Sequence, residues 1–105
     1  MTFHSAVTID MTEGEIQKQI IDYCTLKGAL VFRMNSGSRN YNNKQAPKGT
    51  PDLFVVLNQK GLWVEVKTLT GKVSEAQLNM HDRLIKLGQR VIIARCLDDV
   101  IKEIK

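Results

Sequence analysis

A chain of 105 residues can build one hydrophobic core, but it is too short for a catalytic domain together with a separate recognition domain. Hydrophobic residues make up 43% of the chain and charged residues 25%, a balance that is typical of globular proteins and excludes a disordered or fibrous chain. The formal net charge of +4 favours an anionic partner without identifying it. We therefore expect a single globular domain over residues 1–105.

The sequence gives no sign of export or of membrane insertion. No apolar run reaches the length of a bilayer span, and no basic segment followed by an apolar one stands near the N-terminus. Cys24 and Cys96 are far apart in apolar surroundings, which predicts two buried free thiols. Free thiols are typical of a reducing compartment, so we expect a soluble cytoplasmic protein.

The first predicted helix covers residues 13–27. Thr12 and Glu15 have the spacing of a capping box, in which each side chain accepts a hydrogen bond from the backbone amide of the other. Apolar side chains follow at helical intervals, and Gly28 supplies a helix terminator. The short β-prone run 29–34 then predicts a strand.

The stretch 35–45 is polar, lacks apolar periodicity and predicts a long loop, of the kind that is often functional. Basic residues stand in and around this loop: Arg33, Arg39, Lys44 and Lys48. Such side chains suit contacts with the phosphates of DNA, although a solvated basic loop has the same composition.

Two β-prone runs, 52–57 and 62–67, predict an antiparallel hairpin joined by the turn-forming residues 58–61. If Leu57 faces Leu62 across this turn, counting outward places the end of one strand beside the end of the other. Side chains alternate between the two faces of a strand, so the apolar residues of the hairpin fill one face. These residues are Leu53, Val55, Val64 and Val66.

Three charged residues, Asp52, Glu65 and Lys67, then project from the other face at one end of the hairpin, with Asp52 opposite Lys67. The plain structural interpretation is an ion pair of Asp52 with Lys67, with Glu65 exposed at a sheet edge. Against it, Glu65 stands between two valines that favour burial, and neighbouring carboxylates repel each other unless a cation lies between them. Two carboxylates and a backbone carbonyl form an all-oxygen site, which suits Mg²⁺ or Mn²⁺ rather than zinc.

The rest of the chain predicts a helix, a strand and a short final helix. Ser74 and Gln77 form a second capping box, and Gly88 ends the helix that they open. The Val- and Ile-rich run 90–95 predicts a strand, and Asp98 is the expected cap of the final helix. The predicted order of elements is α-β-β-β-α-β-α.

The pair Pro51-Asp52, followed at a distance by Glu65-Val66-Lys67, resembles the PD-(D/E)XK nuclease signature. The longer pattern is similar to the VRR-NUC family of these nucleases and spans residues 13–97. It comprises Glu15 in the first helix, Arg33 to Gly37 after the first strand, Gly49 to Asp52, Glu65 to Lys67, and Val73 to Gln77. The resemblance implies a restriction-endonuclease-like α/β fold, in which helices flank a mixed central sheet.

The resemblance also implies a metal site. Asp52 and Glu65 would bind Mg²⁺ or Mn²⁺, with the Val66 carbonyl as a further ligand. Glu15 would hold a metal-bound water or a second ion, unless its capping box occupies it.

Two further residues would act in catalysis. Lys67 would orient or deprotonate the attacking water, or stabilise charge on the phosphate. Gln77 would steady Lys67 or the phosphate, or else be a glutamine whose hydrogen bonds are satisfied within the helix–sheet interface.

The expected protein is thus a metal-dependent endodeoxyribonuclease. It looks like the small standalone members of the family from phages and bacteria, which the resemblance associates with homodimeric cleavage of four-way (Holliday) DNA junctions. Two alternatives remain: a nicking or flap-type repair nuclease with the same site, and a DNA-binding module of the same fold that has no catalytic activity.

Overall fold

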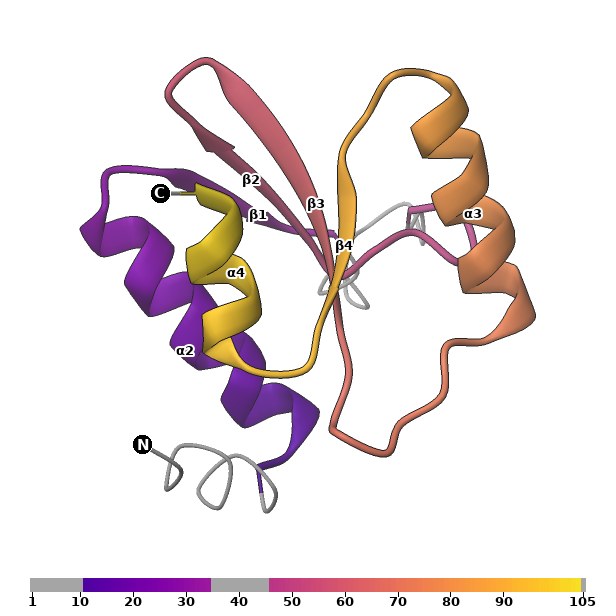
Figure 1. Cartoon of the computed structure of the whole chain (residues 1–105), viewed down its shortest axis with the longest axis horizontal. Coiled ribbons are helices and arrows are strands. Elements are labelled where there is room, and N and C mark those ends of the chain that lie inside the picture. The colour runs from indigo at the N-terminus through magenta and orange to yellow at the C-terminus, as the bar shows by residue number, and fades with distance from the viewer. Residues whose placement is uncertain (1–10, 35–45, 105) are drawn as a thin grey trace, which may run out of the picture.

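The structure is a computed structural model that describes residues 11–34 and 46–104, and it contains one mixed sheet with helices on both sides (Figure 1). The elements carry the labels of Figure 1: α2 (Glu13–Leu26), β1 (Leu30–Arg33), β2 (Leu53–Leu57), β3 (Lys60–Val66), α3 (Glu75–Lys86), β4 (Val91–Ala94) and α4 (Leu97–Ile104). The predicted α/β class and the predicted order of elements are confirmed.

The four strands are arranged in the order β1-β2-β3-β4. β1 pairs with β2 and β2 with β3 in antiparallel fashion, whereas β3 and β4 are parallel. A parallel pair requires a crossover connection, and α3 supplies it here. β3 therefore lies inside the sheet with a strand on each side, and its C-terminal end is next to that of β4.

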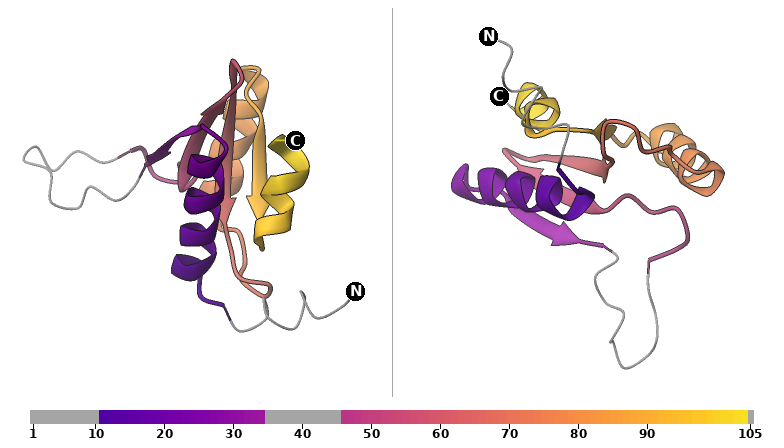
Figure 2. Two further views of the ribbon diagram at one scale, coloured as in Figure 1. Left: turned by 90° about the vertical axis from the view of Figure 1, so that its left-hand side faces the viewer. Right: turned by 90° about the horizontal axis from the view of Figure 1, so that it is seen from below.

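The two faces of the sheet differ in character. α2 and α4 cover one face and α3 lies on the other (Figures 1 and 2). The hydrophobic core comprises Ile16, Ile20, Cys24, Ala29, Leu53, Val55, Leu62, Val64, Val66, Ala94 and Val100. It includes residues of α2 and α4 and all four predicted core-facing residues of the hairpin, whereas the buried residue of α3 is a histidine, His81. The face beneath α3 is thus free to carry polar groups.

The hairpin pairs Leu57 with Lys60 and not with Leu62, so the predicted register is wrong by two residues. Asn58 and Gln59 alone form the turn, with φ values of 54° and 67°. Positive φ at both central residues is the signature of a type I′ turn, whose twist matches that of the flanking strands. Because side chains alternate along a strand, a shift of two residues leaves each one on its predicted face.

Both predicted capping boxes are present. Thr12 and Glu15 exchange hydrogen bonds of 2.9 and 3.1 Å at the start of α2. Ser74 and Gln77 do the same, with the same two distances, at the start of α3. An N-cap of this kind stabilises a helix by about 1 kcal/mol. The two capping boxes therefore define where the helices on opposite faces of the sheet begin.

The start of α4 differs from the prediction. The helix begins at Leu97, so Asp98 lies in its first turn, and the prediction of Asp98 as the cap is wrong. The next residue, Asp99, accepts a hydrogen bond of 2.8 Å from the backbone amide of Arg95 and ties the helix to the end of β4. Cys96 is half-buried rather than buried, and both thiols are free.

The predicted loop over residues 35–45, with Arg39 and Lys44, lies outside the described residues. Among the described helices, none is long and apolar enough to cross a membrane.

Gly49 marks a close approach between the segment that leads into β2 and the first turn of α3. Its φ is +88°, and a Cβ atom placed on it would lie only 2.2 Å from the backbone oxygen of Ala76. Thr50, the next residue, is fixed by its amide and its hydroxyl, which both donate to the carbonyl of Pro47 at 3.1 and 2.6 Å. The absence of a side chain at Gly49 thus lets this segment pack against α3.

We expect Gly49→Ala to destabilise the protein more than Gly88→Ala, its matched control. Gly88 has a similar φ of +86°, but a Cβ atom there would meet nothing within 4 Å. Alanine costs about 1–2 kcal/mol at either position because of its backbone conformation, and only at Gly49 is a steric clash added. Urea unfolding of the two variants measures the difference. Equal losses would show that the segment can move away from α3 at no cost.

Candidate active site

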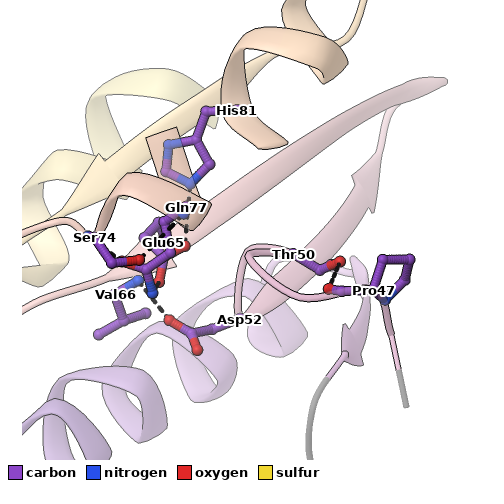
Figure 3. A network of polar contacts seen from close by, with 8 residues as sticks. All are labelled: Pro47, Thr50, Asp52, Glu65, Val66, Ser74, Gln77 and His81. Carbon is purple, nitrogen blue, oxygen red and sulfur yellow. Dashed lines mark hydrogen bonds and ion pairs between the residues drawn. The ribbon is translucent and has the colours of Figure 1, made fainter. Parts of the chain in front are cut away.

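Two carboxylates meet where β2 begins and β3 ends. Counting one position outward from the Leu53–Val64 pair places Asp52 opposite Glu65, on the face that carries α3. Oδ2 of Asp52 accepts a hydrogen bond of 2.8 Å from the backbone amide of Val66 (Figure 3). Asp52 is thereby held against the end of β3, beside the second carboxylate.

Glu65 is almost completely buried, with 1% of its surface exposed. Nε2 of Gln77 donates to its Oε2 at 3.1 Å, and Nε2 of His81 lies 3.1 Å from its Oε1 (Figure 3). Gln77 and His81 are four residues apart and therefore project from the same side of α3. One helix thus supplies a partner to each oxygen of the buried carboxylate.

These surroundings change the proton affinity of the side chains. Burial, followed by the neighbouring carboxylate of Asp52, raises the pKa of Glu65 to about 8, and the positive charge of Lys67 opposes this shift. Burial is also the main reason that the pKa of His81 is lowered. In the metal-free protein near neutral pH, Glu65 thus holds a proton and His81 is neutral.

Lys67 lies directly after β3, where its backbone amide donates to the carbonyl of Ala94 at 3.0 Å. Its charge influences the pKa of both Glu65 and His81, so the three side chains are close in space. The burial of Glu65 excludes the interpretation in which it is exposed at a sheet edge. The structure therefore brings Asp52, Glu65 and Lys67 together, as the alternation of the hairpin predicts.

Gln77 is in the site, but with another partner than Lys67 or the phosphate. Its amide nitrogen bonds Glu65, while its amide oxygen accepts the backbone amide of Ser74 at 2.9 Å in the capping box. One side chain thus closes the first turn of α3 and fixes the buried carboxylate.

Glu15, for which two roles were open, is seen in the helix cap, with its carboxylate on the amide of Thr12. The side chain of α2 that contributes to the raised pKa of Glu65 is that of Glu13, two residues earlier. Sequence reasoning missed Glu13 because its position beside the site depends on how α2 packs against the sheet.

Sequence reasoning also missed the contact of His81. The signal was its position four residues after Gln77, on the stripe of the helix that faces the sheet. The carboxylate that it meets belongs to a strand sixteen residues earlier, and only the packing of α3 on the sheet brings the two together.

The predicted basic residues are not all on one face. Arg33 ends β1 and lines a surface hollow together with Gln17 and Ile21 of α2, on the opposite side of the sheet from Glu65. Lys48 is exposed in the segment that leads to Gly49. Arg39 and Lys44 fall in the part of the chain that the structure does not describe.

The chemistry of the site is that of oxygen donors. Within residues 11–34 and 46–104, no three histidine, cysteine or acidic side chains form a ready-made metal cluster. Asp52 and Glu65 could hold a cation only with help from a backbone carbonyl and water, which is a common arrangement for Mg²⁺. A cation there would relieve the repulsion that raises the pKa of Glu65. The donor set therefore fits a hard divalent metal.

The raised pKa predicts that the metal-free protein loses stability as pH rises. A carboxyl whose pKa is higher in the folded than in the unfolded state stabilises the fold at low pH, and Glu65 loses this contribution between about pH 4.5 and 8. Above pH 6.5, His81 is neutral in both states and does not interfere.

From pH 6.5 to 8 we expect a loss of about 1–2 kcal/mol, or several degrees in melting temperature. Glu65→Gln keeps the shape of the side chain without a titratable proton, so it should remove this decline and raise the stability at pH 8. Thermal melts with a chelator present measure both effects. A wild-type melting temperature that is constant over this range would contradict the proposed state of Glu65.

Comparison with known proteins agrees with this geometry. Residues 8–97 match the model of the VRR-NUC domain family. A phage relative with the name "Putative nuclease p44", from Acyrthosiphon pisum secondary endosymbiont phage 1, is 32% identical over 82 residues. The alignment covers 77% of this chain and 80% of that relative.

Two solved structures share the fold. One, titled "VRR_NUC domain", has a TM-score of 0.69 and 29% identity, over 88% of this chain and 94% of its own. The other, "VRR_NUC domain protein", has the same TM-score with 21% identity, over 89% and 84% of the two chains, and supports the fold alone. The predicted restriction-endonuclease-like fold is thereby confirmed. On the family match, the phage relative and the shared fold, this chain belongs to the VRR-NUC family.

Proposed function

We propose that the protein is a DNA endonuclease that hydrolyses phosphodiester bonds with the help of Mg²⁺ or Mn²⁺. The observation that carries the proposal is the buried Glu65, which lies beside Asp52 and is held by two side chains of α3. A buried carboxylate next to another one destabilises the fold, so a protein with no catalytic activity would gain nothing from it. Membership of a nuclease family supports the same conclusion.

Each residue of the site has a distinct part in this proposal. Asp52 and Glu65 would hold the metal, together with the Val66 carbonyl, and Gln77 keeps the Glu65 carboxylate in place. A bound metal would neutralise the phosphate and lower the pKa of a bound water. Lys67 would orient or deprotonate the attacking water or stabilise the phosphate.

We assign the contacts with DNA phosphates to Arg39, Lys44 and Lys48, and to Arg33 at the end of β1. Each phosphate that a basic side chain neutralises adds about 0.9 to the slope of log binding constant against log salt concentration. The measured slope of the wild-type protein therefore counts these contacts, and a slope near zero would leave the four residues as a solvated face.

We expect Asp52→Asn, Glu65→Gln and Lys67→Ala each to abolish most cleavage without unfolding the protein or releasing DNA. The reason is that these side chains would bind metal and water rather than fill the hydrophobic core. Asp82→Asn is the matched control, because Asp82 is an exposed acid of α3 that pairs with Lys86.

Single-turnover rates, melting temperatures and DNA binding are measured side by side for all four variants. Full activity in the Asp52 variant would remove the metal site from the mechanism. Equal loss in the Asp82 control would point to α3 as a whole rather than to the carboxylate pair.

We further propose that the active species is a homodimer that cuts four-way junctions on opposing strands. One domain of this size carries one site, whereas a two-fold dimer presents two sites to a substrate with approximate two-fold symmetry. The likeness to standalone members of the family supports this step. Apolar residues of α2 are used in the core, and exposed ones lie instead just after it and on the edge strand β1: Leu26, Leu30 and Phe32.

The test combines sedimentation at micromolar concentration with a panel of labelled substrates: duplex, flap, splayed arm and four-way junction, each with Mg²⁺ and with Mn²⁺. We expect a dimer that prefers the junction and makes paired cuts in a cruciform plasmid. A monomer that prefers flaps or nicks duplex DNA would favour the repair-nuclease alternative. DNA binding without cleavage under every condition would favour the binding module.

A further inference from the structure

Arg95 has a set of contacts that neither the core nor the carboxylate pair explains. It follows β4 directly, and its backbone amide is fixed by the carboxylate of Asp99. Its Nη1 atom lies within hydrogen-bond distance of three backbone carbonyls, those of Thr68, Leu69 and Gly71, at 2.6, 3.3 and 2.8 Å. All three carbonyls belong to the loop between β3 and α3.

This loop joins two parts of the candidate site. Lys67 immediately precedes it, and Ser74 and Gln77, which cap α3 and hold Glu65, follow it. The loop also packs against Lys67, because a Cβ atom on Gly71 would lie 3.6 Å from Cδ of that side chain. The conformation of the loop therefore influences the positions of both Lys67 and Gln77.

The loop has few bonds of its own. Within it, the structure records one backbone hydrogen bond, from the amide of Gly71 to the carbonyl of Thr68, at 3.3 Å. The regular sheet pairing ends beside it, where the amide of Lys67 donates to Ala94. A guanidinium is suited to the free carbonyls, because it offers only donors and keeps its charge at every pH of interest. Arg95 thus takes the place that a further strand residue would have.

We propose that Arg95 is a positioning residue of the cleavage site, which holds the loop between β3 and α3 so that Lys67 and the start of α3 keep their places. The inference rests on the proposed function and adds a residue that touches neither carboxylate. Asp52 lies on the other side of Glu65, at the start of β2, so the metal ligands do not depend on this loop in the same way.

The test uses three variants of the full chain. Arg95→Met removes the donors and keeps an apolar stem, Arg95→Lys restores a cation with donors, and Arg90→Met is the control. Arg90 precedes β4 at its opposite end and pairs with Glu103, away from the site. All assays are run well below the melting temperature of each variant, so a general loss of stability does not enter the rates.

We expect Arg95→Met to lower the single-turnover rate at saturating DNA about ten- to hundredfold, the range that a small misplacement of a catalytic group produces. The affinity for Mn²⁺, measured by calorimetry, and the affinity for DNA should stay within about twofold. Arg95→Lys should recover part of the rate, and Arg90→Met should match the wild type. In the metal-free protein, the amides of residues 69–73 should exchange hydrogen faster in Arg95→Met than in the control.

Several results would overturn the proposal. An unchanged rate in a folded Arg95→Met, or unchanged exchange in the loop, would show that the contacts do not position anything. A weaker affinity for DNA with an unchanged rate would make Arg95 a phosphate contact instead. If Arg95→Met does not fold, a wild-type rate in Arg95→Lys together with wild-type exchange in the loop decides against the proposal. A wild-type protein that does not cleave DNA refutes the proposed function, and the exchange experiment still tests the loop.

Discussion

The burial of Glu65 is the constraint around which the rest of this structure is organised. An ionised carboxylate in the interior of a protein is costly unless hydrogen bonds or opposite charges compensate for it. Here Gln77 and His81 bond its two oxygens, and the charge of Lys67 favours its ionised form. The position of α3 is therefore a requirement of the site, because no other described element reaches both oxygens.

The same requirement explains the asymmetry of the sheet. The face beneath α2 and α4 holds the apolar core, with Val64 and Val66 almost fully buried on either side of Glu65 in the chain. These two valines anchor β3 from one face, while the carboxylate between them projects toward α3. A strand that is buried on both faces moves little, which suits a group that must stay in one place. The rigid support and the polar site are thus two faces of one strand.

The sequence predicted most of the elements because their signals are local. Capping boxes, helical spacing and the alternation of the hairpin depend on residues close together in the chain, and these predictions are confirmed. The register was wrong because Lys60 and Gly61 look like turn residues, whereas the actual turn places Gln59 at positive φ, a conformation that glutamine seldom adopts. An error of two residues did not affect the face, which is why the predicted group of charges still formed.

What the sequence did not reveal depends on packing between distant segments. The contact of His81 with Glu65 and the contacts of Arg95 with the loop join residues that are 16 and 24–27 positions apart. No periodicity records such pairs, because each partner looks ordinary in its own element. The start of α4 was misplaced for a related reason, since Asp99 bonds the end of the preceding strand.

Gln77 shows how such packing restricts the choice of amino acid. For a capping box alone, glutamate and glutamine are equivalent at this position, because either can accept the amide of Ser74. The second contact removes that equivalence, since a glutamate would place a third negative charge against Glu65 and Asp52, where the amide now donates a hydrogen bond. Among natural variants of this chain, drift between the two residues should therefore be free at Glu15 of α2, as far as its cap is concerned, and closed at Gln77. The same local motif is thus interchangeable on one helix and fixed on the other.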